Sequence, residues 1–200
     1  MSSQNSQRGR PAIYDDGSII DAVMDVIWRT GFSGASISDI SKASGTSRAS
    51  LYKLYGDKHA VLAAALDHYA AKFDARVDKT LGDTQDPIEA VSTTLRASAD
   101  RLSDPKAPNG CLRCRTTLEL KGESPVVDEA IERANCAFEA NMLRLLAADG
   151  RAYPQHPSLA RFLTATVNGM VVLAEAGASR EDLLGLVDHA TNVVWSELQP

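Results

Sequence analysis

Residues 36–58 of the chain, SISDISKASGTSRASLYKLYGDK, predict two short helices joined by a tight turn. Ser36 can cap the first helix, and Asp39 three residues later completes a capping-box pattern. Gly45 can adopt the left-handed conformation that ends a helix, and Ser47 is placed to cap the helix that follows. Such a short turn between two helices is typical of a helix-turn-helix.

The second helix of this stretch offers a row of hydrogen-bond donors. Ala49 and Leu51 are expected to face the core. An arginine can form two hydrogen bonds to a guanine in the major groove, and hydroxyls can meet phosphates or base edges. We therefore expect this helix to read DNA with the side chains that are left to point outward, which are Arg48, Ser50, Tyr52 and Lys53.

Between residues 31 and 62, glycines, capping residues, aromatic residues and apolar residues follow one another in a fixed order. They are Gly31, Phe32, 36–40, Ala43, Gly45, 47–55, Asp57, Lys58, Val61 and Leu62. In this order they resemble the N-terminal domain of the tetracycline-repressor-like (TetR) family of transcriptional regulators. The resemblance implies that Tyr52 contacts a DNA phosphate, that Tyr55 packs inside the domain and that Lys58 contacts the DNA backbone. Leu54 departs from the pattern, because the family often has histidine or another polar residue at this position.

The first twelve residues, MSSQNSQRGRPA, form a polar segment that carries Arg8 and Arg10. A basic arm of this kind is expected to enter a minor groove or follow the phosphates. An ordinary loose terminus has the same composition, so that alternative stays open. The predicted DNA-binding residues are thus Arg8, Arg10, Ser36, Ser47, Arg48, Ser50, Tyr52, Lys53 and Lys58.

Apolar residues recur at helical spacing through the rest of the chain, and no strand-like alternation competes with them. The first helix is expected to end at Gly31, and a long helix from Lys58 to about residue 81 connects the N-terminal part to the remainder. We predict an all-α fold in which a three-helix helix-turn-helix domain at 1–57 joins a ligand-binding and dimerisation bundle at 58–200. Further helices are expected over about 87–102, 111–121, 125–148, 158–178 and 180–198.

Composition excludes several classes of protein. The chain of 200 residues is 44% hydrophobic, has a net charge of −5 and contains three cysteines. It has no signal-like segment and no apolar run of membrane-spanning length, so we expect a cytoplasmic protein without a membrane partner. Glycine-rich phosphate loops, serine hydrolase motifs and paired metal-ligand motifs are absent from the sequence. We therefore predict no catalytic residues, no cofactor and no metal site, and a protein that is not an enzyme.

The last two predicted helices carry apolar faces that are broader than one helical hairpin needs. In the TetR-like family the last two helices form a four-helix bundle with their symmetry mates. The resemblance therefore implies a homodimer, whose predicted interface residues are Met170, Leu186, Ala190 and Val193. The alternative is that these faces are buried within one subunit.

The resemblance also implies a small-molecule inducer, bound in a pocket inside the C-terminal bundle. Binding pockets are mostly apolar and have a few polar anchors. The candidate ligand-binding residues are Tyr69, Phe73, Arg113, Thr117, Phe138, Asn141, Phe162 and Asn168.

Cys111 and Cys114 form a CxxC motif at the expected start of a helix. A single CxxC is a weak zinc signal, and thioredoxin-like chemistry needs a preceding strand. The helix N-terminus and the flanking Arg113 and Arg115 favour the thiolate, so the pair is a candidate redox or electrophile sensor. Small buried cysteines that complete the bundle are the alternative.

Taken together, the residues and the resemblance predict a transcriptional repressor. It binds a palindromic operator as a homodimer and is released by a small-molecule inducer. Two alternatives stay open: a helical protein that binds small molecules, and a thiol redox sensor, both without operator binding.

Overall fold

The computed structural model describes residues 16–152 and 154–198, so the predicted DNA contacts Arg8 and Arg10 lie outside it. Regular structure within these ranges is helical throughout, which confirms the predicted all-α fold. The helices are α1 (Asp16–Gly34), α2 (Ile37–Ser44), α3 (Arg48–Tyr55), α4 (Lys58–Asp83), α5 (Pro87–Ser103), α6 (Leu112–Leu120), α7 (Pro125–Leu146), α8 (His156–Glu175) and α9 (Arg180–Leu198).

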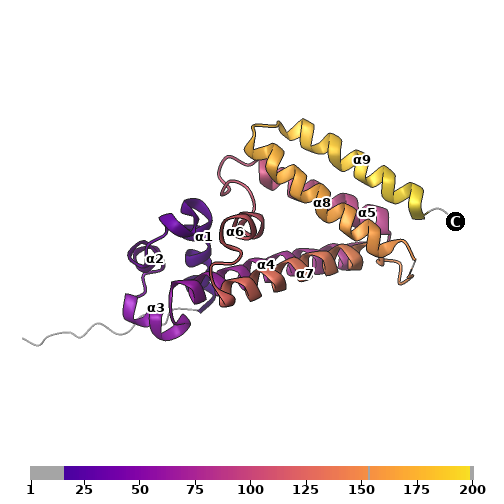
Figure 1. Ribbon diagram of the computed structural model, residues 1–200. Coiled ribbons are helices and arrows are strands. Elements are labelled where there is room, and N and C mark those ends of the chain that lie inside the picture. Colours follow the sequence, from indigo (N-terminus) through magenta and orange to yellow (C-terminus); the bar gives the residue numbers. More distant parts are fainter. Residues whose placement is uncertain (1–15, 153, 199–200) are drawn as a thin grey trace, which may run out of the picture.

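Helices α1 to α3 form a separate group at one end of the molecule, which we call the head (Figure 1). Gly31 has a φ of 71° and breaks α1 where the sequence predicts its end, although the chain turns helical again up to Gly34. Ile27, Ile40 and Leu51 bring the three helices into one buried cluster. Each of the three helices therefore contributes a side chain to the core of the head.

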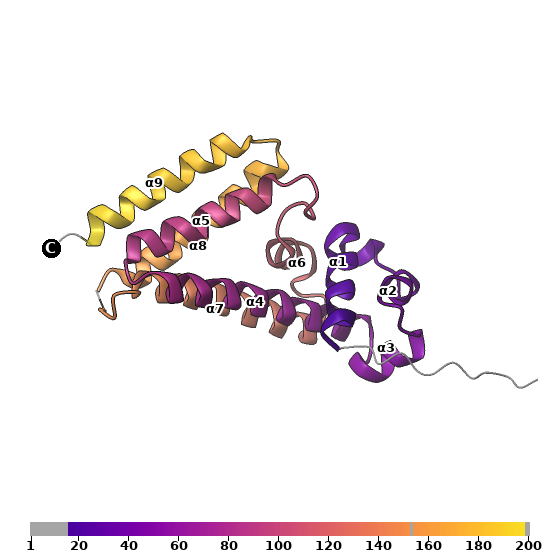
Figure 2. The ribbon, with the colours of Figure 1, turned by 180° about the vertical axis from the view of Figure 1, so that it is seen from behind.

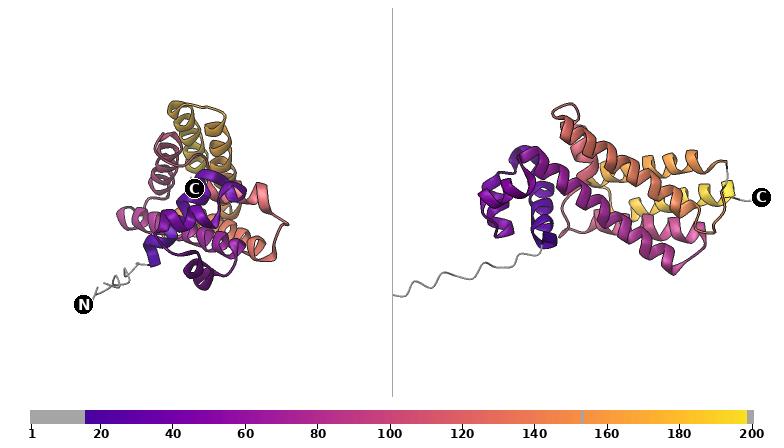
Figure 3. Two further views of the ribbon diagram at one scale, coloured as in Figure 1. Left: turned by 90° about the vertical axis from the view of Figure 1, so that its left-hand side faces the viewer. Right: turned by 90° about the horizontal axis from the view of Figure 1, so that it is seen from below.

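The rest of the chain forms a helical bundle, which we call the body. Helices α4 and α7 run side by side along the molecule, α5 and α8 pack against them, and α9 packs on α5 and α8 (Figures 1 and 2). Seen from below, α4 leads from the head into the bundle (Figure 3). Among the residues that fill the body core are Phe73, Val77, Leu95, Phe138, Met142, Leu163, Met170, Val187 and Ala190.

The core of the head extends beyond the predicted domain limit at residue 57. Val61, Leu62 and Leu66 of α4 are completely buried in the same cluster as the head residues. Leu112 and Leu120 of α6 belong to this cluster too. The start of α4 and one side of α6 therefore connect the head physically to the body.

Two of the predicted dimer-interface residues lie in the core of their own subunit. Met170 is 0% exposed and Ala190 is 1% exposed, so a second copy cannot contact them in this structure. Their apolar character serves the packing of α8 and α9 within the subunit, which is the alternative that helical periodicity left open. Val193 is 37% exposed and Leu186 is partly buried on the adjacent turns of α9.

Helix α8 is, by length and mean hydropathy of 1.2, apolar enough to cross a membrane. Its side chains Leu159, Leu163 and Met170 are nevertheless part of the body core. One face of the helix therefore packs within the bundle, whereas Phe162, Val172 and Leu173 on the rest of its surface are exposed.

Candidate DNA-binding face and ligand cavity

Helix α2 begins at a capping box. The backbone N–H of Asp39 donates to Ser36 Oγ over 3.1 Å, and the backbone N–H of Ser36 donates to Asp39 Oδ2 over 3.3 Å. The Ser36 side chain also hydrogen-bonds the Asp39 carboxylate, and this contact lowers the pKa of Asp39. Gly45 ends the helix with a φ of 65°. The Ser36 side chain is therefore occupied by capping, while it stays exposed beside the face where DNA contacts are expected.

The turn between α2 and α3 is held by a residue that sequence reasoning missed. Thr46 is 5% exposed, and its carbonyl accepts a hydrogen bond of 2.7 Å from Ser41 Oγ. A lone threonine next to a glycine carries no periodic signal, so only the folded turn reveals its role. These contacts fix α3 relative to α2.

Helix α3 presents its polar side chains to solvent. Ser47 caps the helix by accepting from the Ser50 backbone N–H over 3.1 Å. Leu51 is completely buried, whereas Tyr52 is 49% exposed. Arg48, Ser50 and Lys53 are exposed as well.

Two other residues of α3 differ in how they meet the core. Ala49, predicted to face inward, is exposed, because the two-turn helix packs chiefly through Leu51. Tyr55 packs partly buried against the head cluster, as the family resemblance implies.

Lys58 lies at the first turn of α4, beside α1. Its Nζ is 4.3 Å from the centroid of the Phe32 ring, and that ring stacks at a tilt on His59, 5.1 Å away between centroids. A cation over an aromatic face is held electrostatically without losing its charge. Lys58 is thus positioned near the N-terminus of α4 while it remains able to meet an anion.

A cavity of ≈ 260 Å³ opens between α6, α7 and α8. Arg113, which is 4% exposed, forms its floor and donates from Nη1 to Asn135 Oδ1 over 2.6 Å and from Nη2 to Asn168 Oδ1 over 2.7 Å. The Arg113 guanidinium carbon also lies 4.2 Å from the centroid of the Phe138 ring. The complete lining is Arg113, Cys114, Thr117, Leu118, Asn135, Asn168 and Val172.

A second, almost filled cavity of ≈ 10 Å³ lies on the other side of Arg113. Phe73 and Phe138 stack with ring centroids 4.8 Å apart. Asn141 is buried and donates to Asp74 on α4. Of the eight predicted ligand residues, those at this cavity are Tyr69, Phe73, Arg113, Phe138 and Asn141, and those at the larger one are Arg113, Thr117 and Asn168.

Phe162 does not belong with the other predicted ligand residues. It is 39% exposed on α8 and is absent from the lining of both cavities. Helical spacing could not show which side of α8 it occupies. Conversely, sequence reasoning missed Asn135, whose amide is fixed between Arg113 and Thr117, because a single asparagine in a helix has no distinctive pattern.

Cys111 and Cys114 lie where the CxxC spacing predicts them, at the N-cap and first turn of α6. The Cys111 sulfur is 3.3 Å from Tyr69 Oη, and Cys114 Sγ donates to Asn168 Oδ1 over 3.2 Å. Interaction with the neighbouring Cys114 thiol, helped by the charge of Arg113, lowers the pKa of Cys111, although burial opposes this effect. The same interaction and burial raise the pKa of Cys114. Within the described part of the chain, no group of three His, Cys, Asp or Glu residues has a geometry suited to a metal ion.

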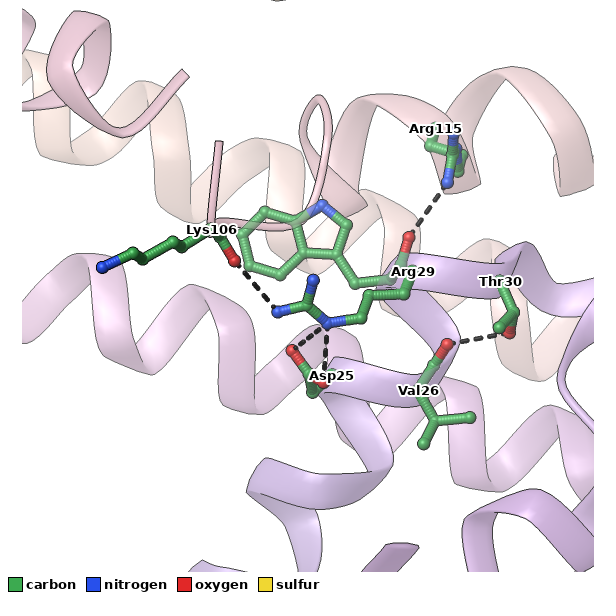
Figure 4. Close-up of polar contacts among 7 residues, drawn as sticks. Asp25, Val26, Arg29, Thr30, Lys106 and Arg115 are labelled. Atoms are coloured by element: carbon green, nitrogen blue, oxygen red, sulfur yellow. Dashed lines mark hydrogen bonds and ion pairs between the residues drawn. The ribbon is translucent and has the colours of Figure 1, made fainter. Parts of the chain in front are cut away.

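The head and the body meet where α1 approaches α6 and the loop before it. Trp28 Nε1 donates to the Asn109 carbonyl over 3.1 Å, and Arg115 Nη1 donates to the Trp28 carbonyl over 2.9 Å. Figure 4 shows Arg29 between Asp25 of its own helix and the Lys106 carbonyl, with bonds of 2.9 and 3.2 Å. Polar contacts therefore hold the last turns of α1 against the body.

Comparison with known proteins adds two family matches and several relatives. The family of bacterial regulatory proteins described as tetR matches residues 19–65, and the C-terminal domain of LmrA/YxaF-like transcriptional regulators matches residues 87–189. The HTH-type transcriptional repressor ComR of Escherichia coli (strain K12) is 27% identical over 197 residues, which cover 96% of this chain and 93% of ComR. The repressor BdcR of the same organism is 23% identical and covers 98% of this chain and 97% of its own length.

Solved structures agree with this assignment. A cysteine mutant of the TetR family regulator CifR, complexed with a 26-bp double-strand operator DNA, has a TM-score of 0.77 and 28% identity over 92% of this chain and 98% of its own. The regulator SCO4454 from Streptomyces coelicolor shares the fold with a TM-score of 0.76 at 19% identity, over 92% of this chain and 89% of its own. The two family matches and the arrangement of α1 to α3 lead to one conclusion: the chain belongs to the tetR family of bacterial regulatory proteins, a family of helix-turn-helix transcriptional regulators rather than enzymes.

Proposed function

We propose that this protein is a cytoplasmic repressor that binds a palindromic operator as a homodimer and releases it when a small molecule binds the body. The observation that carries the proposal is the exposed polar face of α3 on a capped helix-turn-helix. It is supported by CifR, which was solved with operator DNA, and by the relatives ComR and BdcR, which are named as repressors. In the proposed complex Arg48 to Lys53 enter a major groove, and Tyr52 and Lys58 contact phosphates.

The proposed dimer uses one flank of α8 and the adjoining flank of α9. Phe162 and Leu173 are 39% and 44% exposed and lie on the same side of α8, as do Leu186 and Val193 on α9. Gly169 lies between the two α8 residues and has open space where a side chain would be, so another helix can approach closely there. The opposite flank of α9 is already in use, because Asp188 pairs with Arg96 of α5. A twofold arrangement places the two heads about 34–36 Å apart, one turn of DNA.

Release is proposed to pass through α6. Arg113 and Cys114 of this helix line the larger cavity, whereas Arg115 holds the carbonyl of Trp28 on α1. Leu112 and Leu120 of α6 are packed in the core of the head. A ligand that shifts α6 must therefore strain or move the head, and it acts as an inducer only if it prefers the form that does not fit the operator.

The operator can be found by selecting DNA bound by the purified protein from fragments of its own genome. We expect a palindrome whose two halves are centred one helical turn apart, and a footprint that requires Arg48. Binding with the same affinity to unrelated fragments, or selected sites without twofold symmetry, would contradict the proposal.

Thiol regulation is a second candidate, and it is favoured by the contacts of Cys111 with Tyr69 and Cys114. Oxidation or an electrophile would modify one thiol and disturb the start of α6. The burial of Cys111, at 5% exposure, favours the alternative that the pair only packs. A Cys111→Ser, Cys114→Ser double variant decides between them: peroxide or a quinone should release wild type from the operator but not the variant. Equal release of both proteins would leave the cysteines as packing residues.

A further inference from the structure

Arg113 is a buried cation that forms no ion pair with a carboxylate among the described residues. Its side chain is 4% exposed, and none of the ion pairs among the described residues includes it. Its hydrogen-bond partners, Asn135 and Asn168, are neutral amides, and its Nε has no partner among the described residues. Burial of a charge is costly unless an opposite charge compensates for it.

The guanidinium retains the capacity to bind a planar anion. Arginine has five N–H donors, and the two amide oxygens use one on each terminal nitrogen. The remaining donors fit the two oxygens of a carboxylate, which arginine binds with two parallel hydrogen bonds. Phe138 lies against the face of the guanidinium, so the group is held flat and cannot turn away from the cavity freely.

The side chains around Arg113 are arranged to keep it in one orientation. Asn168 Oδ1 accepts from both Arg113 and Cys114, and Asn135 Nδ2 donates to Thr117 Oγ1 over 3.4 Å. Thr117 Oγ1 in turn donates to the Arg113 carbonyl over 2.9 Å. Groups from α6, α7 and α8 therefore converge on one cation at the base of a cavity.

The mouth of the cavity is apolar, so a matching ligand needs an apolar group as well as an anionic one. At its mouth are Leu118, which is 83% exposed, and Val172, which is 61% exposed. A volume of ≈ 260 Å³ lies just below the range of pockets for drug-sized ligands, about 300–1,000 Å³. A ligand that joins a carboxylate to one ring or a short aliphatic chain matches both features.

We propose that the larger cavity is a binding site for a small carboxylate with an apolar group, whose oxygens are held by Arg113 and whose apolar part contacts Leu118 and Val172. The proposal deepens the inducer site and rests on the proposed function only for the regulatory consequence. Binding itself does not require that the protein release an operator. No bond is made or broken in this step.

The test is direct binding to the purified protein, without DNA. Sodium benzoate, salicylate and hexanoate serve as probes, and benzamide, salicylamide and hexanamide are their neutral counterparts. We expect carboxylates to raise the melting temperature of the wild type and to give a titratable heat, while the amides do neither. If the amides stabilise the protein as much as the carboxylates, or if none of the three carboxylates binds at millimolar concentration, the proposal is wrong.

Arg113→Met removes the charge and keeps an apolar stem of similar length. We expect this variant to melt at the same temperature as the wild type or higher, because a buried charge without a counter-charge is replaced by an apolar group. Its affinity for the best carboxylate should fall about tenfold or more. Arg113→Gln, which retains some hydrogen bonding, should show the same loss of affinity. If both variants fail to fold or bind the carboxylate unchanged, Arg113 is a structural residue and the proposal falls.

Two matched controls locate the site. Arg76→Met changes an exposed arginine that lines a different cavity of ≈ 150 Å³, so it should leave carboxylate affinity unchanged. Arg115→Met changes the next arginine of α6, which points to Trp28, and should also keep the affinity while weakening the effect of ligand on operator binding. Loss of carboxylate binding in Arg76→Met but not in Arg113→Met would move the anion to the other cavity and overturn the assignment. Carboxylate binding that leaves operator affinity unchanged would confirm the site and reject its role as the inducer site.

Discussion

The head and the body hold their functional residues in opposite ways. In the head, Arg48 and Tyr52 are exposed on a two-turn helix, and the ends of that helix are fixed by neighbouring residues such as Ser47. In the body, Arg113 is buried and is held by Asn135 and Asn168, which come from two other helices. DNA is a large partner that must be met at the surface, whereas a small ligand is held inside a cavity that several helices enclose.

This difference means that the two sites depend on different scales of structure. To bind DNA, the face of α3 needs only the correct local fold of the head and a second subunit. Its residues can therefore be recognised from their spacing in the sequence. The cavity exists only when α6, α7 and α8 are packed together. Changes to the head should therefore affect DNA binding with little effect on the body, and the predictions below test this separation.

The largest effect is expected from separating two subunits. A Leu173→Glu, Val193→Glu double variant places charges on the proposed dimer flank, and monomers should lose about 100-fold or more in operator affinity because the two half-sites are no longer held together. Analytical ultracentrifugation and fluorescence anisotropy measure the two properties. Trp195→Glu is the control, because Trp195 is 53% exposed yet lies about 200° round α9 from Val193. A wild type that is monomeric at micromolar concentration would reject the dimer.

Arg48→Ala is expected to have the next largest effect. Loss of a two-bond contact with a base should cost about 1–3 kcal/mol in operator affinity and relax the sequence preference at one position of each half-site. Competition between the operator and single-base variants measures both properties. The melting temperature should not change, since Arg48 is exposed. An equal loss of affinity for every sequence would make Arg48 a phosphate contact instead.

Ser36→Ala tests how far local capping fixes the head. Removal of an N-cap hydroxyl should destabilise the protein by about 1 kcal/mol at neutral pH. Ser36 lowers the pKa of Asp39, so the part of the cap that rests on the contact between Ser36 and the Asp39 carboxylate is present above the pKa of an unfolded aspartate and is lost as pH falls through the lower folded value. Denaturant unfolding at several pH values should show the gap between wild type and variant narrowing in acid. A gap independent of pH would mean that the Asp39 carboxylate takes no part in the cap.

The smallest effect is expected from Lys58→Ala. As a phosphate contact, Lys58 should contribute equally to all DNA sequences, and its loss should reduce the slope of log affinity against log salt by about one. Affinity measured over a range of salt concentrations gives that slope. Lys79→Ala, on the same helix but outside the first turn, should leave it unchanged. An unchanged slope for Lys58→Ala would mean that this side chain only packs on Phe32.

How far the sequence can predict this structure depends on the range of the interactions concerned. The caps at Ser36 and Ser47 and the left-handed Gly45 were predictable, because each acts on residues within four positions along the chain. The faces of α8 and α9 were not, since an apolar stripe shows that a side is buried but not which surface covers it. Met170 and Ala190, which the apolar stripes place among the predicted interface residues, are buried within the subunit.

The sequence by itself determined the all-α fold, the helix-turn-helix and the outward row of donors on α3, because helix periodicity and capping are local properties of the chain. Only the tertiary structure decided that Arg113 is buried without an acidic partner, that Asn135 joins it and that Phe162 turns away. These three residues come from α6, α7 and α8, and Asn135 and Asn168 approach Arg113 across separations of 22 and 55 residues. Contacts over such distances follow from how whole helices pack, which depends on many side chains at once and leaves no short pattern in the sequence.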